Sequence, residues 1–368
     1  MSLPSPAPTR HVLIGYLTRE LLERILATAV ILLALMEILA LLEQLTPILE
    51  RHQGAGGIAY FMLLHAPILL GGTLPLAVLI GSLVLLVQMT TGSEIAILRA
   101  AGLTTPGLTR LMLPAILALG VAGALADDQI TPRTELALAR WWNRTDPHPE
   151  AGHGFWFRSG MTLADIGYVS HGGTTLVHVD LYQRGPAGRL LRTVHLNTLH
   201  YADGKWTDDG GRSLEPTGAA IHTATLAPAP AQDHGWPAGL RPADMIRLSM
   251  DAPPLSAATI IAILRGHAPA SQPAAALRTA LLARVLTPFS FAVMLLLALP
   301  VVYIPPRSGT RSWLPVWCLG AGLLFVVFQG MLRALGNAGT LPAPAATLPG
   351  IVIFTLAVCA LVLRIEER

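Results

Sequence analysis

A cationic side chain near the end of an apolar stretch is the first candidate for chemistry in this sequence. Arg333 lies four residues after Gln329 and eight after Phe325, so a helix would place the three side chains on one face. A planar guanidinium can hold a phosphate with two donors, which suits an anionic ligand. The alternative is an arginine whose stem lies on apolar surface while its charge reaches water. Arg51 and Arg133 are weaker candidates for the same role.

A short polar segment between two apolar stretches supplies the second set of candidates. Thr91 and Glu94 have the spacing of a capping box, and Gly102 is placed to end a helix. We therefore predict a short capped helix that is available to a partner protein. Its candidate contact residues are Ser93, Glu94, Leu98 and Arg99. The alternatives are that Glu94 only caps the helix and that Arg99 only anchors it at a membrane surface.

Glu37 is a carboxylate deep inside an apolar stretch. A carboxylate in hydrocarbon is costly, so it usually faces a cavity or a partner, and it can be protonated or paired there. Phe328 and Leu332, with Phe325, could line an apolar cavity. The alternative for these three is ordinary packing or contact with lipid.

Several kinds of site are missing from the sequence. Lys205 is the only lysine and lies in a turn-like sequence, so the chain has no Walker A motif for binding ATP. Cys318 and Cys359 both lie in apolar runs, which favours two buried thiols over a disulfide or a zinc site. A metal site at His148 and His153 is a minor alternative to flexible loop histidines. We predict no catalytic residue, no cofactor, no metal site and no nucleic-acid partner for this chain.

The composition predicts a membrane protein with a polar insertion. The chain is 52% hydrophobic and only 13% charged, whereas a soluble domain carries about 25% charged residues. Residues 129–272 hold 24 of the 47 charged side chains. Six apolar segments are long enough to cross a bilayer. They are residues 25–42, 58–87, 108–126, 281–304, 314–335 and 348–363.

The distribution of arginine predicts the orientation of these spans. The first apolar run is too long for a cleavable signal, so we interpret it as the first span. Four stretches on one side of the membrane carry most of the arginines of the short links. These are Arg10, Arg19 and Arg24, then Arg99 and Arg110, then Arg307 and Arg311, and finally Arg364 and Arg368. We expect both termini in the cytoplasm and the polar domain in a periplasm.

The sequence pattern of the polar domain predicts an all-β fold. Residues 155–157 and 161–169 suggest a hairpin, and further strands are expected at 175–182 and 194–201, before a turn at Asp203 and Gly204. We expect a loop at 227–242 and a helix within 254–267. The strands favour a sandwich or jelly roll. Its inward-facing residues would include Trp156, Val177, Val179 and Leu181, which would form either a plain sandwich core or a hydrophobic slot.

Five segments of the chain resemble the LptF/LptG permeases of lipopolysaccharide export. They are residues 74–81 (LPLAVLIG), 93–103 (SEIAILRAAGL), 154–160 (GFWFRSG), 291–300 (FAVMLLLALP) and 306–308 (PRS). Three of these segments look like the LptG branch: residues 154–160, 291–300 and 306–308. The order of the regions is also that of the family. Spans 1–3 occupy residues 1–128 with a coupling helix at about 92–102, the β-jelly-roll domain occupies 129–272, and spans 4–6 occupy 273–368.

The resemblance implies partners and a role. Such permeases pair with a paralogue, here an LptF-like chain, and with an LptB-like ATPase dimer that holds ATP and Mg²⁺. The complex takes lipopolysaccharide from the inner membrane and passes it through the β-domains to an LptC-like bridge protein. By this resemblance, Glu94 and Arg99 would couple the chain to the ATPase, and Arg333 would meet lipid phosphates. Family members often carry lysines at the periplasmic end of the first span, and this chain has none there.

Three other functions remain as alternatives. A lipoprotein-release or MacB-like permease places its large domain between the first two of four spans, so the three-plus-three layout counts against it. A membrane-anchored scaffold would need no capped cytoplasmic helix. A membrane enzyme acting on lipid would need a catalytic set, and none is visible in the sequence.

Overall fold

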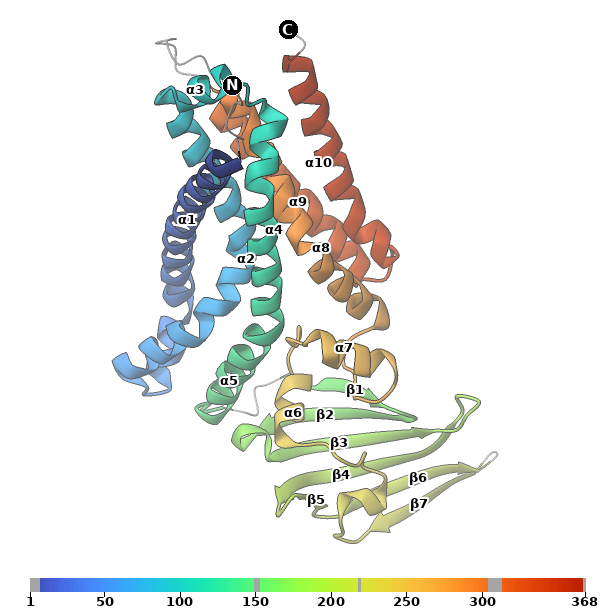
Figure 1. Cartoon of the computed structure of the whole chain (residues 1–368). Coiled ribbons are helices and arrows are strands. Elements are labelled where there is room, and N and C mark those ends of the chain that lie inside the picture. The colour runs from blue at the N-terminus through green and yellow to red at the C-terminus, as the bar shows by residue number, and fades with distance from the viewer. Residues whose placement is uncertain (1–6, 149–152, 218–219, 304–312, 367–368) are drawn as a thin grey trace. The chain divides into compact units, whose positions relative to one another are not determined.

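The computed structural model describes residues 7–148, 153–217, 220–303 and 313–366 (Figure 1). The predicted motif at 306–308, with Arg307 and Arg311, lies outside these residues. The α-helices are α1 (Ala7–Glu50), α2 (Gly54–Thr91), α3 (Glu94–Ala100), α4 (Thr105–Gln129), α5 (Thr131–Arg144), α6 (Pro242–Leu248), α7 (Ala257–Leu264), α8 (Ala274–Ala298), α9 (Leu314–Asn337) and α10 (Ala343–Glu366). The strands are β1 (Phe155–Ser159), β2 (Thr162–Ser170), β3 (Thr175–Arg184), β4 (Leu190–Ala202), β5 (Lys205–Asp208), β6 (Gly211–Thr217) and β7 (Ala220–Leu226), with 3₁₀ turns η2 (His171–Gly173), η3 (Ala231–His234) and η4 (Leu299–Tyr303).

Among the described residues, six helical segments are long and apolar enough to cross a membrane, and the seven strands lie between the third and the fourth of them. This confirms the predicted spans and the all-β insertion. The helices are longer than the apolar runs that predicted them, and α1 alone has 44 residues. A helix satisfies its own backbone hydrogen bonds, so it can continue past the apolar run into water without losing them.

Residue contacts divide the chain into two compact units. The first comprises Met1–Leu42, Ile68–Asp127 and Arg278–Arg368, and the second comprises Glu43–Pro67 and Asp128–Leu277. The second unit therefore holds the β-domain together with the adjoining ends of α1 and α2. The sequence did not predict that these helix ends belong with the β-domain.

The helices of the first unit approach one another at small residues. A Cβ at Gly81 of α2 would lie 2.6 Å from Cα of Ile25 in α1. A Cβ at Gly120 of α4 would lie 2.5 Å from Cα of Pro288 in α8. Glycine at these crossings lets the helix backbones approach closely enough to pack without a driving force from water.

The second unit is built on one antiparallel sheet. Its strand order is β1-β2-β3-β4-β6-β7, and β5 pairs with the second half of β4. The predicted hairpins are confirmed at β1–β2 and at β4–β5, where Asp203 and Gly204 both have positive φ. The strands form a single sheet, and its second layer is made by η3, α6 and the chain between them.

A crease crosses this sheet through Gly167, His178 and Asn197. The register pairs the residues on either side of these three but not the three themselves, and His178 has a φ of 54°. Buried residues along a strand are normally two or four apart, but across the crease they are three apart. These buried pairs are Ile166 and Val169, Leu176 and Val179, and Leu196 and Leu199. One unpaired residue at the same level of each strand therefore reverses which face of the sheet the following side chains occupy.

The crease explains a wrong prediction about the inner face. Val179 and Leu181 are buried as expected, but Val177 lies beyond the crease and shares a face with exposed positions. Trp156 is 47% exposed and stacks on Tyr182 on the outer face. The period of two placed Val177 on the wrong side because it assumed an uninterrupted strand.

The inner face is covered by the chain itself. The segment predicted as a loop at 227–242 contains η3, and it packs Trp236 and Leu240 against the buried strand residues. The indole N–H of Trp206 donates to the Leu240 carbonyl at 2.8 Å, and the ring of Trp236 lies 6.0 Å from that of Phe157. The predicted slot is therefore filled by residues of the same domain in this structure.

Gly120→Ala should destabilise the first unit, because the new methyl group would meet the backbone of Pro288. Overpacking of this kind costs about 1–3 kcal/mol. Scanning fluorimetry of the detergent-solubilised chain should show a lower midpoint of thermal unfolding. Gly320→Ala is the matched control, because a Cβ at Gly320 meets no atom within 4 Å. Equal midpoints for the two variants would contradict the close crossing of α4 and α8.

Candidate functional site

The helix α3, predicted to meet a partner, begins directly after α2. Ser93 is its N-cap with a left-handed φ of 63°, and Glu94 is the first helical residue. The Thr91 hydroxyl donates to the carbonyls of Val87 and Gln88 in α2. The predicted capping box is wrong, because α2 continues through Thr91 and its last turn takes that hydroxyl.

The Glu94 carboxylate instead faces α1, where the Tyr16 hydroxyl donates to its Oε2 at 3.3 Å. Two backbone bonds close the other end of α3: Gly102 donates to Arg99, and Leu103 donates to Leu98, both at 2.9 Å. With a φ of 87° at Gly102, these bonds form a Schellman motif. The predicted end of the helix at Gly102 is confirmed.

The two faces of α3 differ. Ile95 is buried and Leu98 packs against the apolar core of the first unit, whereas Ile97 is 67% exposed. The guanidinium carbon of Arg99 lies 4.7 Å from the ring centre of Tyr303, and Nη2 lies 3.5 Å from Oγ1 of Thr105. Arg99 therefore holds α3 against its neighbours while remaining exposed, and the outward surface combines an apolar side chain with this cation.

The α9 residues predicted to bind lipid lie on one helix face, as expected from their spacing. Phe325 is buried edge-on against Phe354 of α10, with ring centres 5.2 Å apart. Gln329 is buried, and its Nε2 donates to the carbonyl of Thr347 at 2.9 Å. Arg333 is half-buried, and its Nε is shielded from solvent without a hydrogen-bond partner among the described residues. Arg333 therefore has an N–H donor that is unused among the described residues, whereas Phe325 and Gln329 pack against α10.

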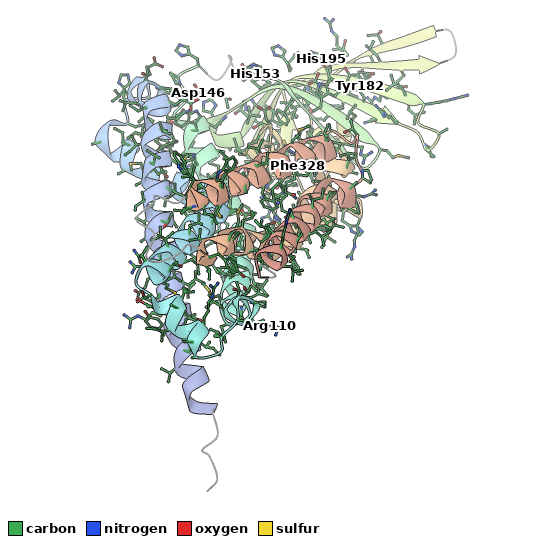
Figure 2. The ribbon with its side chains drawn as sticks, turned by 90° about the horizontal axis from the view of Figure 1, so that it is seen from above. Arg110, Asp146, His153, Tyr182, His195 and Phe328 are labelled. Carbon is green, nitrogen blue, oxygen red and sulfur yellow. The ribbon has the colours of Figure 1, made fainter. Side chains whose placement is uncertain are left out.

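The remaining apolar candidates are partly covered. Phe328, labelled on α9 in Figure 2, is half-buried with its ring 6.2 Å from that of Phe354, and Leu332 is half-buried as well. Glu37 in α1 is only 5% exposed. These three side chains are therefore at least partly covered by the chain itself.

Arg51 and Arg133 have very different surroundings. The Arg51 side chain is only 10% exposed, and its guanidinium carbon lies 4.1 Å from the ring centre of Trp142 in α5. Its Nη2 lies 3.7 Å from Oδ1 of Asp146, and Nη1 donates to the Pro47 carbonyl at 3.2 Å. Arg133 is exposed in the first turn of α5. The sequence analysis missed α5 because the only helix it expected in 129–272 lay within 254–267, although Pro132 near the start of α5 is a helix signal.

Three ionisable side chains lie directly opposite one another on the outer face of the sheet: Asp165 in β2, Asp180 in β3 and His195 in β4. Figure 2 labels His195 together with Tyr182 on this sheet. His195 Nδ1 and Asp180 Oδ1 are 2.7 Å apart. Burial, and secondly the charge of Asp180, raise the pKa of the Asp165 carboxyl above its usual value. Burial and the same two carboxylates raise the pKa of the Tyr182 hydroxyl.

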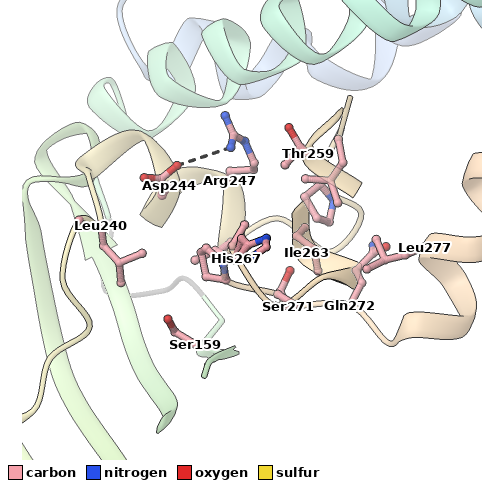
Figure 3. A pocket seen from close by; sticks show the side chains of 18 of the residues that line it. Ser159, Leu240, Asp244, Arg247, Thr259, Ile263, His267, Ser271, Gln272 and Leu277 are labelled. Carbon is pink, nitrogen blue, oxygen red and sulfur yellow. Dashed lines mark hydrogen bonds and ion pairs between the residues drawn. The ribbon is translucent and has the colours of Figure 1, made fainter. Parts of the chain in front are cut away.

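A cavity of about 420 Å³ lies within the second unit, between α6, α7 and the chain that follows them (Figure 3). Its apolar walls include Leu240, Ile263 and Leu277. Its charged pair, Arg247 and Asp244, is satisfied internally at 3.5 Å. The lining therefore mixes apolar walls with polar groups that bond mostly to the chain itself.

The fold and these side chains define a class of protein: a multi-pass membrane protein with a β-domain inserted between two groups of three spans. Within the described residues, no group of three or more potential metal ligands comes together. The sequence profile described as lipopolysaccharide export system permease LptF/LptG matches residues 15–364. The chain therefore belongs to the LptF/LptG family, whose members are membrane components of a transporter and are not enzymes. The predicted family is confirmed, and the profile covers both branches. No curated protein matches the chain in a sequence comparison.

Asp165→Asn should stabilise the β-domain at neutral pH. A raised pKa in the folded state means that the ionised carboxylate disfavours folding, and this penalty disappears as pH falls towards the unfolded value of about 3.9. Relief from a like charge directly opposite is worth about 0.5 kcal/mol. Scanning fluorimetry should show a higher unfolding midpoint at pH 7.5 and a smaller gain at pH 4.5. Asp203→Asn, in an exposed turn, is the control, and a pH-independent gain for Asp165→Asn would contradict this account.

Proposed function

We propose that this chain is the LptG-type permease subunit of a lipopolysaccharide exporter in a bacterial inner membrane. It pairs with an LptF-like chain and an LptB-like ATPase dimer, and it delivers lipid to an LptC-like bridge protein. The termini lie in the cytoplasm and the β-domain in the periplasm. The observation that carries the proposal is the family match over residues 15–364. The sequence of residues 154–160 supports the LptG branch, and the arginines of the short links support the orientation.

In this proposal α3 is the coupling helix. It is short, ended at both sides by tight turns, and connected to the long helices α2 and α4. The outward Ile97 and Arg99 offer an apolar and a cationic contact, and Glu94 sits at the helix start beside Tyr16. Closure of the partner ATPases on bound ATP would move α3 and, through α2 and α4, the spans. The ATP and Mg²⁺ belong to the partner subunits.

Arg333 is the proposed contact for an anionic lipid headgroup. Its Nε is shielded and lacks a hydrogen-bond partner among the described residues, and a guanidinium matches phosphate geometry. Phe325, Phe328 and Leu332 lie on or beside the same face and would meet acyl chains. The first span has no lysine for this task, so Arg333 would supply the charge that family members often place on that span.

Coupling is tested with the chain co-expressed with candidate ATPase and paralogue subunits. Glu94→Arg should reduce lipopolysaccharide-stimulated ATP hydrolysis about tenfold or prevent assembly, because it reverses the charge at the start of α3. Tyr16→Phe is the control, since it removes the hydroxyl that donates to Glu94 but leaves the carboxylate. Normal assembly and activity of Glu94→Arg would contradict the coupling role, and a wild-type chain that brings down no ATPase would contradict the proposed function.

Headgroup contact is tested in the same complex. Arg333→Gln should weaken the stimulation of ATPase by lipopolysaccharide by about tenfold in lipid concentration, because a charge-assisted contact is lost, while Arg333→Lys should retain part of it. A photoreactive residue in place of Leu332 should cross-link lipopolysaccharide. Placed at Met331, which is exposed on another face, it should do so less. Equal cross-linking at both positions, with unchanged stimulation in Arg333→Gln, would reject this site.

A further inference from the structure

Arg51 lies at the centre of an aromatic junction between the α1–α2 hairpin and α5. The junction consists of Arg51, Tyr60, Phe61, Trp141 and Trp142. Ring centres are 5.5 Å apart for Tyr60 and Trp141, 6.2 Å for Phe61 and Trp142, and 5.6 Å for the two tryptophans. Arg51 lies 4.1 Å above the ring of Trp142. All of these residues belong to the second unit.

The guanidinium group of Arg51 makes its contacts with residues in and beside this junction. Its side chain is 10% exposed, and Asp146 and the Pro47 carbonyl supply its polar contacts. Its Nε is shielded from solvent without a hydrogen-bond partner among the described residues. Cation–π attraction strengthens when the cation is desolvated, so the Trp142 ring compensates for water that the guanidinium has lost.

The residue after Trp142 connects the junction to the sheet. Asn143 donates from Nδ2 to the Val169 carbonyl of β2 at 3.0 Å, and it accepts from the backbone N–H of Gly172 in η2 at 2.9 Å. Consecutive residues of α5 therefore bind the α1–α2 hairpin and the β-domain. A displacement of the α1–α2 hairpin would therefore be transmitted to β2 through α5.

The other end of the same path is α3. α2 connects Phe61 of the junction to Thr91, thirty residues later and directly before α3. Pro67 and Pro75 interrupt the hydrogen bonding of α2, and the boundary between the two units falls at Pro67. α2 thus has a rigid part that ends beside α3, a proline-rich segment, and a part held by the junction.

We propose that Arg51 and Trp142 are positioning residues for transport: they fix the α1–α2 hairpin to α5, so that the β-domain follows the movement of α1 and α2. This inference rests on the proposed function, because it takes α3 as the point where the ATPase acts. It assigns Arg51 a mechanical role. Loss of the junction should separate ATP hydrolysis from lipid delivery.

The test compares two activities of the reconstituted complex in vesicles that contain lipopolysaccharide. These are lipopolysaccharide-stimulated ATP hydrolysis and transfer of lipid to the periplasmic acceptor protein. Trp142→Leu and Arg51→Gln should keep hydrolysis within about twofold of the wild type and lower transfer about tenfold. Trp142→Phe keeps an aromatic face and should retain more lipid transfer than Trp142→Leu. Arg51→Lys keeps the charge and should retain more lipid transfer than Arg51→Gln.

A cross-link distinguishes coupling from general damage. Cys318 and Cys359 are first replaced by serine, and Arg51→Cys is combined with Asp146→Cys. This variant should transfer poorly until a short cleavable bismaleimide joins the two positions, and cleavage of the linker should abolish transfer again. Such rescue is expected only if the junction acts by holding the hairpin to α5.

The outcomes separate the two ideas. A wild-type complex without lipopolysaccharide-stimulated hydrolysis would overturn the proposed function. In an active wild-type complex, normal transfer by Trp142→Leu would overturn the junction's role. Parallel loss of hydrolysis and transfer in all four single variants, or the absence of rescue by the cross-link, would overturn it too.

Discussion

Hydrocarbon offers no hydrogen-bond partners, and this constraint shapes the whole chain. Each span must be a helix, and once a helix has formed it can continue into water at no loss of backbone bonding. α1 is about 66 Å long, roughly twice the ~30 Å of hydrocarbon. Its far end therefore belongs with the second unit rather than the first. The ends of α1 and α2 in the second unit place Arg51 and Phe61 against Trp142 of α5.

Much of this architecture could be predicted because its causes are local. The lengths of the apolar runs predicted six spans, the turn residues Asp203 and Gly204 predicted a hairpin, and Gly102 predicted the end of a helix. The errors come from non-local causes. Thr91 does not cap α3, because its hydroxyl bonds within α2, and α2 extends beyond the apolar run that predicted it. Val177 was misplaced because three neighbouring strands each have an unpaired residue at the same level, where the side chains change faces.

The candidate site shows the same division. Helical spacing correctly placed Phe325, Gln329 and Arg333 on one face, but no spacing could reveal that Gln329 bonds to Thr347 of the next helix. Arg51 was chosen for its charge alone. Its partners Trp142 and Asp146 are more than ninety residues away in sequence. Trp142 lies on α5, a helix within a region predicted as β-rich, and Asp146 follows the end of that helix. The residue type identifies a cation that could bind a ligand, but packing determines whether its charge is accessible to that ligand.

The covered inner face of the sheet has a thermodynamic consequence. Trp236 and Leu240 occupy the surface that an acyl chain would need, and they are attached to the same domain. They act as an intramolecular competitor that is present at a fixed, high local concentration. The apparent affinity of any apolar molecule for this face equals its intrinsic affinity multiplied by the fraction of molecules in which the segment has moved away. Under the proposed transport role, binding of an acyl chain there would exchange one apolar contact for another, and the whole face would not be exposed to water at any stage.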